Sequence, residues 1–198
     1  TKNSVSVTIT QQNFQKEEKE VIENLGAIFI YFNPNSLMEI FKISIDFIIE
    51  NSFKNPSLII ISSYFLATPT TSFTYGTVLI EYLIEKMEQM GNSLPEKSNI
   101  ILKLFKLVFG SVSVFPAENE KMLKPHLHKL VNKSLEYSLK TKDPYNYFLL
   151  LRALFRSIGG GNHDLLYQEF LPLLPILLQS LNDLQIGFHK QYLRDLFV

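Results

Sequence analysis

The sequence contains no cysteine and no tryptophan, and only 19% of its 198 residues are charged. Without cysteine the chain forms no disulfide and offers no thiolate ligand to a metal, which favours an intracellular compartment. No run reaches the roughly 18 consecutive apolar residues of a membrane-spanning helix, because serines, prolines or polar residues interrupt the longest ones, 59–67 and 165–181. The first residues show neither a signal peptide nor a starting methionine. We therefore expect no contact with a membrane.

The net charge is zero and unevenly distributed along the chain. Residues 1–94 hold 6 basic and 10 acidic side chains, whereas residues 95–198 hold 13 and 9. This asymmetry is too mild for binding nucleic acid by phosphate neutralisation, so no direct nucleic-acid contact is expected.

Apolar residues recur at helical spacing from Lys16 onward. In the first helix the apolar positions are Val21, Leu25, Ile28 and Phe32. The predicted helices span about 16–32, 37–50, 58–67, 72–90, 95–115, 117–140, 143–158 and 163–183, and a ninth begins near residue 186 and is cut in mid-pattern at the C-terminal end. Residues 1–15 are polar, with a short alternation of apolar positions, and are expected to form a flexible tail.

Several local features refine these helices. The helix 58–67 is apolar nearly all round, which predicts burial on both sides. Gly91 is expected to end the fourth helix in a left-handed cap. Pro125 lacks an amide donor and should kink or restart the sixth helix.

The predicted helices group into pairs. Pairs begin near residues 17, 56, 95 and 143, at separations of 39, 39 and 48, close to the roughly 40–47 residues of HEAT and armadillo repeats. The segment 143–183 is typical of a HEAT unit, with Asp143-Pro144 at its start, Arg152 in its first helix and a Leu-Pro-rich second helix. The fold class is therefore all-α, a HEAT-like solenoid of about four antiparallel helix pairs over 16–198. A plain all-α bundle is the alternative.

No pattern in the sequence predicts catalysis, a cofactor or a metal. His126 and His128 are two positions apart on a helix and point in nearly opposite directions, so they cannot share a metal. His163 precedes Asp164 at a helix start, where a capping role is expected. The glycines at 159–161 lack the preceding strand of a phosphate loop and are better explained as a helix terminator. No carboxylate falls within an apolar stripe, so no acid/base pair is predicted.

One surface feature suggests a binding role. His126, Lys129, Lys133 and Lys140 fall within about 60° on a helical wheel and form a basic stripe beside the apolar face of the sixth helix. The stripe is suited to an acidic activation segment or another subunit. A solvated outer helix face is the simpler interpretation.

Long stretches of the sequence resemble a known family. They are 16–21, 67–72, 103–113, 117–120, 122–129, 144–161, which ends in Arg-Ser-Ile-Gly-Gly-Gly, and 163–172. These stretches are similar to the transformation/transcription domain-associated protein family, giant pseudokinase scaffolds related to phosphatidylinositol kinases. The likeness covers roughly residues 16–198.

The resemblance implies a segment of the family's N-terminal HEAT region, distant from its kinase-like domain. It also implies a nuclear, non-catalytic scaffold in histone acetyltransferase complexes such as SAGA. The implied partners are transcriptional activators, other subunits of the complex and the rest of the same solenoid. The same helical physics would also suit a solenoid adaptor of another class, such as a transport receptor or a phosphatase scaffold.

Overall fold

The computed structural model describes residues 16–17, 19–141, 143–161 and 163–185, and this part of the chain is helical with no strand. The first helix covers residues 19–28. The α-helices that follow are α2 (Pro34–Lys54), α3 (Ile59–Ala67), α4 (Pro69–Glu85), α5 (Gln89–Asn92), α6 (Pro95–Val114), α7 (Pro116–Leu123), α8 (Leu127–Lys140), α9 (Tyr145–Gly159), α10 (Asp164–Phe170) and α11 (Leu174–Gln185). Short 3-10 turns separate some of them: η1 (Phe29–Tyr31), η2 (Pro56–Leu58), η3 (Lys124–His126) and η4 (Leu171–Leu173). The predicted tail 1–15 and the ninth helix from residue 186 lie outside the described residues.

Proline sets the start of many of these helices. Proline occupies the first position of the helices that begin at Pro34, Pro69, Pro95 and Pro116. Its fixed φ suits the first helical turn, and its missing amide hydrogen would have no partner there in any case. Pro125 lies inside a predicted helix instead, and the structure divides that helix into α7, η3 and α8. The restart expected at Pro125 is confirmed.

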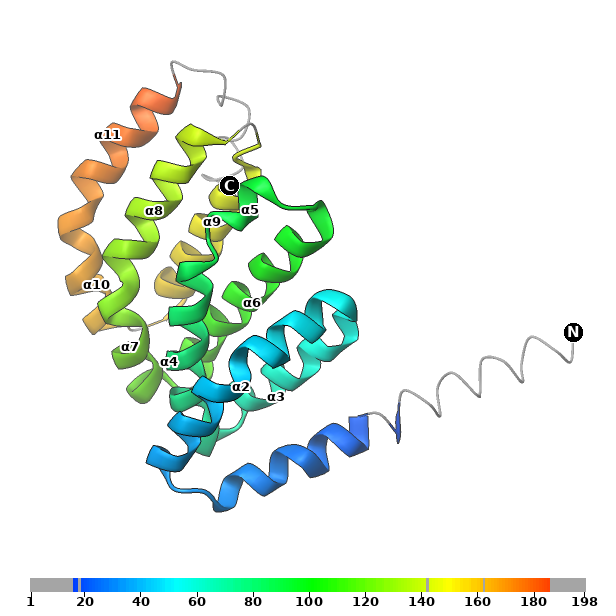
Figure 1. Cartoon of the computed structure of the whole chain (residues 1–198). Helices are drawn as coiled ribbons and strands as arrows, with labels where there is room; N and C mark the ends of the chain where they lie inside the picture. The colour runs from blue at the N-terminus through cyan, green and yellow to red at the C-terminus, as the bar shows by residue number, and fades with distance from the viewer. Residues whose placement is uncertain (1–15, 18, 142, 162, 186–198) are drawn as a thin grey trace, which may run out of the picture.

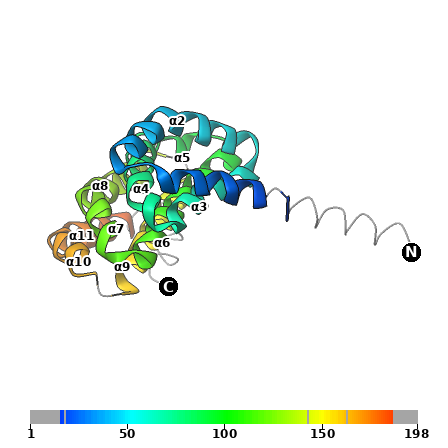
Figure 2. The same cartoon turned by 90° about the horizontal axis from the view of Figure 1, so that it is seen from below.

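The helices alternate between two layers that run the length of the molecule (Figures 1 and 2). The outer layer, as we name it, contains α2, α4, α7, α8, α10 and α11, in which α2 packs on α4, α4 on α7, and α8 on α10 and α11. The inner layer contains α3, α6 and α9, which pack on one another in that order. The chain crosses between the layers from α2 to α3, from α3 to α4, and from α8 through α9 to α10, whereas α7 and α8, and likewise α10 and α11, follow each other within the outer layer. The all-α solenoid predicted from the pairing is therefore confirmed.

The core is continuous from α2 to α11. At its N-terminal end, the rings of Phe29, Phe41, Phe65 and Tyr75 lie with neighbouring centroids 4.9–5.7 Å apart. Further along, Asn119 of α7 is fully buried, and its side-chain amide donates to Ser72 of α4 at 2.8 Å and to the carbonyl of Ser111 of α6 at 3.0 Å. This polar contact joins α4, α6 and α7 and fixes their positions relative to one another.

The first helix packs through a different face from the one predicted. Val21, Leu25 and Ile28 are 66%, 44% and 55% exposed. The helix instead approaches α3 at Gly26, where an added Cβ would lie 1.9 Å from the ring of Tyr64. The helix has two apolar stripes of helical spacing, and either could face the core. Because glycine has no side chain, the helix can approach α3 closely only on the stripe that contains Gly26.

Two further expectations were wrong. Gly91 does not take a left-handed conformation and lies within α5. A Cβ there would lie 2.3 Å from Cγ2 of Thr141, so close packing explains this glycine. Helix α3 is buried on one side only, because Ile60 and Ala67 remain exposed on its outward side.

Candidate functional site

The structure places the predicted basic stripe at the junction of η3 and α8. His126 ends η3 and is half-buried, while Lys129, Lys133 and Lys140 lie on α8. The buried face of α8 contains Leu127, Leu130, Val131, Ser134, Leu135 and Ser138. Because 3.6 residues complete a helical turn, the three lysines fall beside that face. All four members of the stripe thus lie along one edge of the outer layer.

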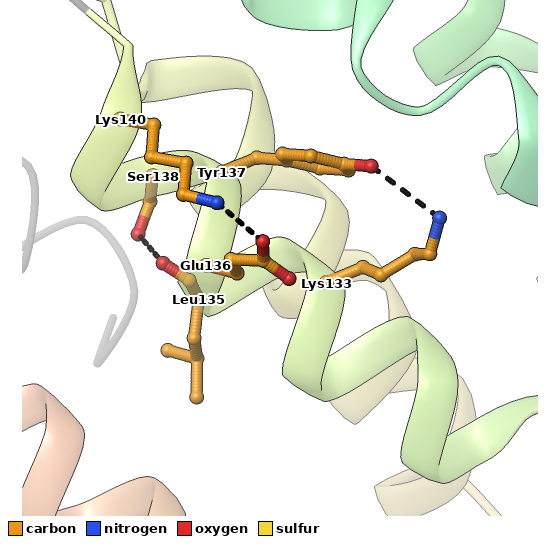
Figure 3. Close-up of polar contacts among 6 residues, drawn as sticks. All are labelled: Lys133, Leu135, Glu136, Tyr137, Ser138 and Lys140. Atoms are coloured by element: carbon orange, nitrogen blue, oxygen red, sulfur yellow. Dashed lines mark hydrogen bonds and ion pairs between the residues drawn. The ribbon is translucent and has the colours of Figure 1, made fainter.

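Neighbouring side chains already engage two of these lysines (Figure 3). The ammonium of Lys140 forms an ion pair with Glu136 at 2.5 Å. This hydrogen bond lowers the pKa of Glu136 and raises the pKa of Lys140. The ammonium of Lys133 donates to the hydroxyl of Tyr137 at 3.3 Å and lies 5.5 Å from the centre of its ring. Both lysines are therefore held in defined positions, and the charge of Lys140 is largely balanced.

The other two members differ in charge. Burial lowers the pKa of His126, and nearby Lys129 adds to that effect, although the carboxylate of Glu81 on α4 opposes it. Burial therefore favours the uncharged form of the His126 imidazole. Lys129 is exposed and forms no hydrogen bond or ion pair within the described part of the chain. It is the member of the stripe best placed to meet an acidic partner.

Other polar residues bind α10 to the helices before it. Glu169 of α10 lies 3.2 Å from Nε2 of His128 and 3.8 Å from the ammonium of Lys124. His128 therefore points toward α10 and away from the stripe that contains His126. In the described residues no group of three or more His, Cys, Asp or Glu side chains is arranged to hold a metal.

Sequence reasoning missed one buried pair. Nδ1 of His163 lies 2.8 Å from Oε1 of Glu120, and the two side chains are only 3% and 9% exposed. His163 occupies the N-cap position of α10, as expected, but its side chain makes no capping hydrogen bond and contacts Glu120 instead. Glu120 also contradicts the expectation that no carboxylate lies on an apolar face. The sequence did hold one indication that Glu120 is buried. Glu120 lies three residues before Leu123 and seven before Leu127, and both leucines are fully buried on the same face.

The buried pair has a structural role. It joins α7 to the start of α10, 43 residues apart in sequence. Neither residue lines the two grooves that flank α3. The pair therefore fastens the last helix pair to the one before it.

Two stacked layers of paired helices and a continuous core define an α-solenoid of the HEAT class. The whole chain, residues 1–198, matches the family described as the Tra1 HEAT repeat central region. The protein belongs to this family, and the resemblance seen in the sequence is confirmed, except that the matching region is described as central and not as the N-terminal HEAT region that the resemblance implied. Among the described residues no helix is both long and apolar enough to cross a membrane.

Named relatives support the assignment. Transcription-associated protein 1 of Drosophila melanogaster is 64% identical over 183 residues, and human transformation/transcription domain-associated protein is 61% identical over 183 residues. The SAGA complex/NuA4 acetyltransferase complex subunit TRA1 of Saccharomyces cerevisiae is 36% identical over 183 residues. Each alignment covers 92% of this chain and 5% of the relative. The chain thus spans about a twentieth of the length of these relatives.

Proposed function

We propose that this chain is a non-catalytic scaffold segment of a nuclear transcription co-activator, which holds part of a histone acetyltransferase assembly and presents surface to other proteins. The observation that carries the proposal is the family membership of a continuous two-layer solenoid. The yeast relative is named as a subunit of SAGA and NuA4 acetyltransferase complexes. Repeats of this kind offer long surfaces rather than one enclosed pocket, which suits assembly better than turnover.

The scaffold role is testable in the full-length protein within its own cells. Phe105 of α6 is fully buried, so Phe105→Asp should disorder this segment. The exposed Lys42 of α2 supplies a matched charge-changing control, Lys42→Glu. Tagged protein is purified, and co-purifying acetyltransferase-complex subunits are quantified relative to the tagged chain. We expect subunits to be lost with Phe105→Asp and retained with Lys42→Glu. Full retention with Phe105→Asp would refute the proposal.

We also propose that the basic stripe contributes to partner binding, whether the partner is an activator or another subunit. The free and exposed ammonium of Lys129, together with the positioned Lys133, supports this role. Crosslinking of the intact assembly through lysine side chains should then join Lys129 or Lys133 to a second protein. If these lysines crosslink only to residues of the same chain, the proposal is refuted and the stripe is a solvated helix face.

The proposal of a transport receptor or phosphatase scaffold receives no such support, because the relatives described above bear transcription-associated or acetyltransferase-complex names. Fluorescence imaging of the tagged full-length protein tests the nuclear location. Exclusion from the nucleus would contradict it.

A further inference from the structure

The inner layer contains two shallow grooves that meet along α3. The first, of about 240 Å³, lies between α3 and α6. Its apolar lining includes Leu66, Leu107 and Val114, and the small residues Ser63, Ala67 and Gly110 also line it. The second, of about 160 Å³, lies between the first helix and α3 and shares Ser63 and Ala67 with the first groove. Small side chains on the outward side of α3 therefore leave a hollow on each flank of the helix.

The larger groove is open because no side chain fills it. A Cβ added at Gly110 would have no heavy atom within 4 Å. Val114 at its end is 57% exposed. An apolar cavity of about 150 Å³ holds a benzene ring in other proteins, so 240 Å³ accommodates at least one large apolar side chain. Exposed apolar surface of this kind gains free energy when a partner covers it.

Charge is segregated between the two layers. Helices α3, α6 and α9 of the inner layer contain five basic side chains and one carboxylate, a net charge of +4. Helices α2, α4, α7, α8 and α10 of the outer layer contain six basic side chains and ten carboxylates, a net charge of −4. The chain is neutral overall, but the groove-bearing layer is basic. Such a field attracts an acidic partner and repels a basic one.

The larger groove has an unpaired lysine side chain at its edge. Lys106 lines the groove, is exposed, and forms no hydrogen bond or ion pair within the described residues. Lys103 lies on the same face of α6 and is also exposed. In contrast, Lys140 of the basic stripe is already paired with Glu136. The groove therefore combines an apolar lining with unpaired positive charge at its edge.

We propose that the groove between α3 and α6 binds a short amphipathic segment of another protein, which inserts a large apolar side chain over Gly110 and places carboxylates against Lys103 and Lys106. The inference rests on the proposed scaffold function, because it names the chemistry of one partner and the place where it binds. The apolar lining disfavours nucleic acid, because phosphates gain nothing from contact with Leu66, Leu107 or Val114. Helical segments commonly bind grooves through apolar residues spaced three and four apart.

A direct binding measurement tests the proposal with the 198-residue chain. The probe is a fluorescein-labelled peptide of roughly 15 residues, with Phe and Leu at helical spacing and Glu or Asp elsewhere. One control peptide carries Lys in place of every acidic residue, and another carries Ala in place of Phe and Leu. Fluorescence anisotropy gives Kd for each. We expect only the acidic, apolar peptide to bind, with Kd rising as salt is added. Absence of binding, or equal binding of either control, would overturn the proposal.

Two variants locate the peptide. Gly110→Leu fills the open groove and should weaken binding about tenfold or more, since one large side chain loses its place. Lys106→Glu should weaken it about three- to tenfold. Lys42→Glu in the outer layer is the matched control and should leave Kd unchanged. Circular dichroism and thermal melting confirm that each variant is folded. An unchanged Kd with Gly110→Leu would overturn the assignment.

The test separates this inference from the scaffold proposal. If Phe105→Asp leaves the assembly intact while the peptide still binds at Gly110, the scaffold proposal is refuted and the assignment of the groove as a peptide-binding site is supported. If co-purification behaves as expected but Gly110→Leu leaves Kd unchanged, the groove assignment alone is refuted.

Discussion

Helix α6 in the middle of the solenoid and helix α2 near one end differ in how much of their surface is covered. Helix α6 packs against α3, α4, α5, α7 and α9, and half of its 20 residues are buried. Helix α2 buries one stripe, formed by Leu37, Phe41, Ile45, Ile49 and Ser52. Its opposite side exposes Ile43 by 83% and Phe47 by 73%. Position along the solenoid, more than hydrophobicity, decides which apolar side chains reach the core.

The largest expected effect compares a phenylalanine from each helix. Phe105 is fully buried beside Phe109, so Phe105→Ala should lower the free energy of unfolding by about 3–5 kcal/mol. Phe47→Ala should change it by less than about 0.5 kcal/mol, because the ring is mostly in solvent. Urea unfolding of both variants measures the difference. Equal losses would mean that α2 is covered as fully as α6.

Two glycines give a smaller contrast of the same kind. Gly91→Ala brings a Cβ within 2.3 Å of Cγ2 of Thr141, a stiff β-branched side chain, and should cost about 1–3 kcal/mol. Gly110→Ala meets open space within a helix and should stabilise the chain by about 0.5–1 kcal/mol. Thermal melting distinguishes the two signs. A destabilising Gly110→Ala would show that the groove is narrower than the structure indicates.

A buried tyrosine in the middle of the molecule gives stability a dependence on pH. Tyr147 is fully buried, and its hydroxyl donates to the carbonyls of Met87 and Glu88. Burial raises its pKa from the ordinary 10 to about 12, so between these values the unfolded chain loses a proton that the folded chain keeps. Stability from this group is complete below pH 10 and is lost as pH rises through 12. Burial raises the pKa of Tyr82 to about 12 as well, with the same sign.

Tyr147→Phe tests this account of alkaline stability. It should cost about 1 kcal/mol near neutral pH, because the carbonyls of Met87 and Glu88 lose the hydroxyl donor that they share. It should also make the loss of stability above pH 10 less steep, because one of the tyrosines with a raised pKa is gone. Unfolding measured by urea at several pH values between 7 and 11 gives both quantities. An unchanged slope for the variant would mean that Tyr147 titrates alike in both states.

The helix pairs were predictable because their signals are local. Prolines such as Pro34 and Pro95 occur where a first turn accepts them, and the apolar spacing of α2 and α9 fixes their buried faces. The four starts near 17, 56, 95 and 143 follow from these signals alone. The basic stripe was placed on one side of α8 by the same periodicity, and whether a partner binds there stays a prediction.

The features that the sequence did not predict depend on contacts between residues far apart in the chain. Phe29, in the η1 turn that follows the first helix, packs against the core, whereas Val21 does not, although both lie in stripes of helical spacing. Contact with Tyr64 at Gly26 selects between the stripes, and that contact depends on tertiary packing. Likewise Glu120 and His163 are separated by 43 residues, so no local pattern pairs them. The inner-layer groove also went unpredicted, because it forms only where α3 meets α6.

The smallest effect on stability concerns the uncovered side of α2. Ile43 and Phe47 lie four residues apart and form an exposed apolar patch. We expect the chain to self-associate through such surfaces at high concentration, since apolar side chains gain free energy when another copy covers them. The double change Ile43→Lys and Phe47→Lys should reduce this association, while the free energy of unfolding shifts by less than about 0.5 kcal/mol for each surface site. Sedimentation velocity at increasing concentration measures the association, and Lys42→Glu on the same helix is the control. A wild-type chain that sediments as a clean monomer throughout would contradict the expectation, and it would show that one bare helix face is too small to bind a second copy.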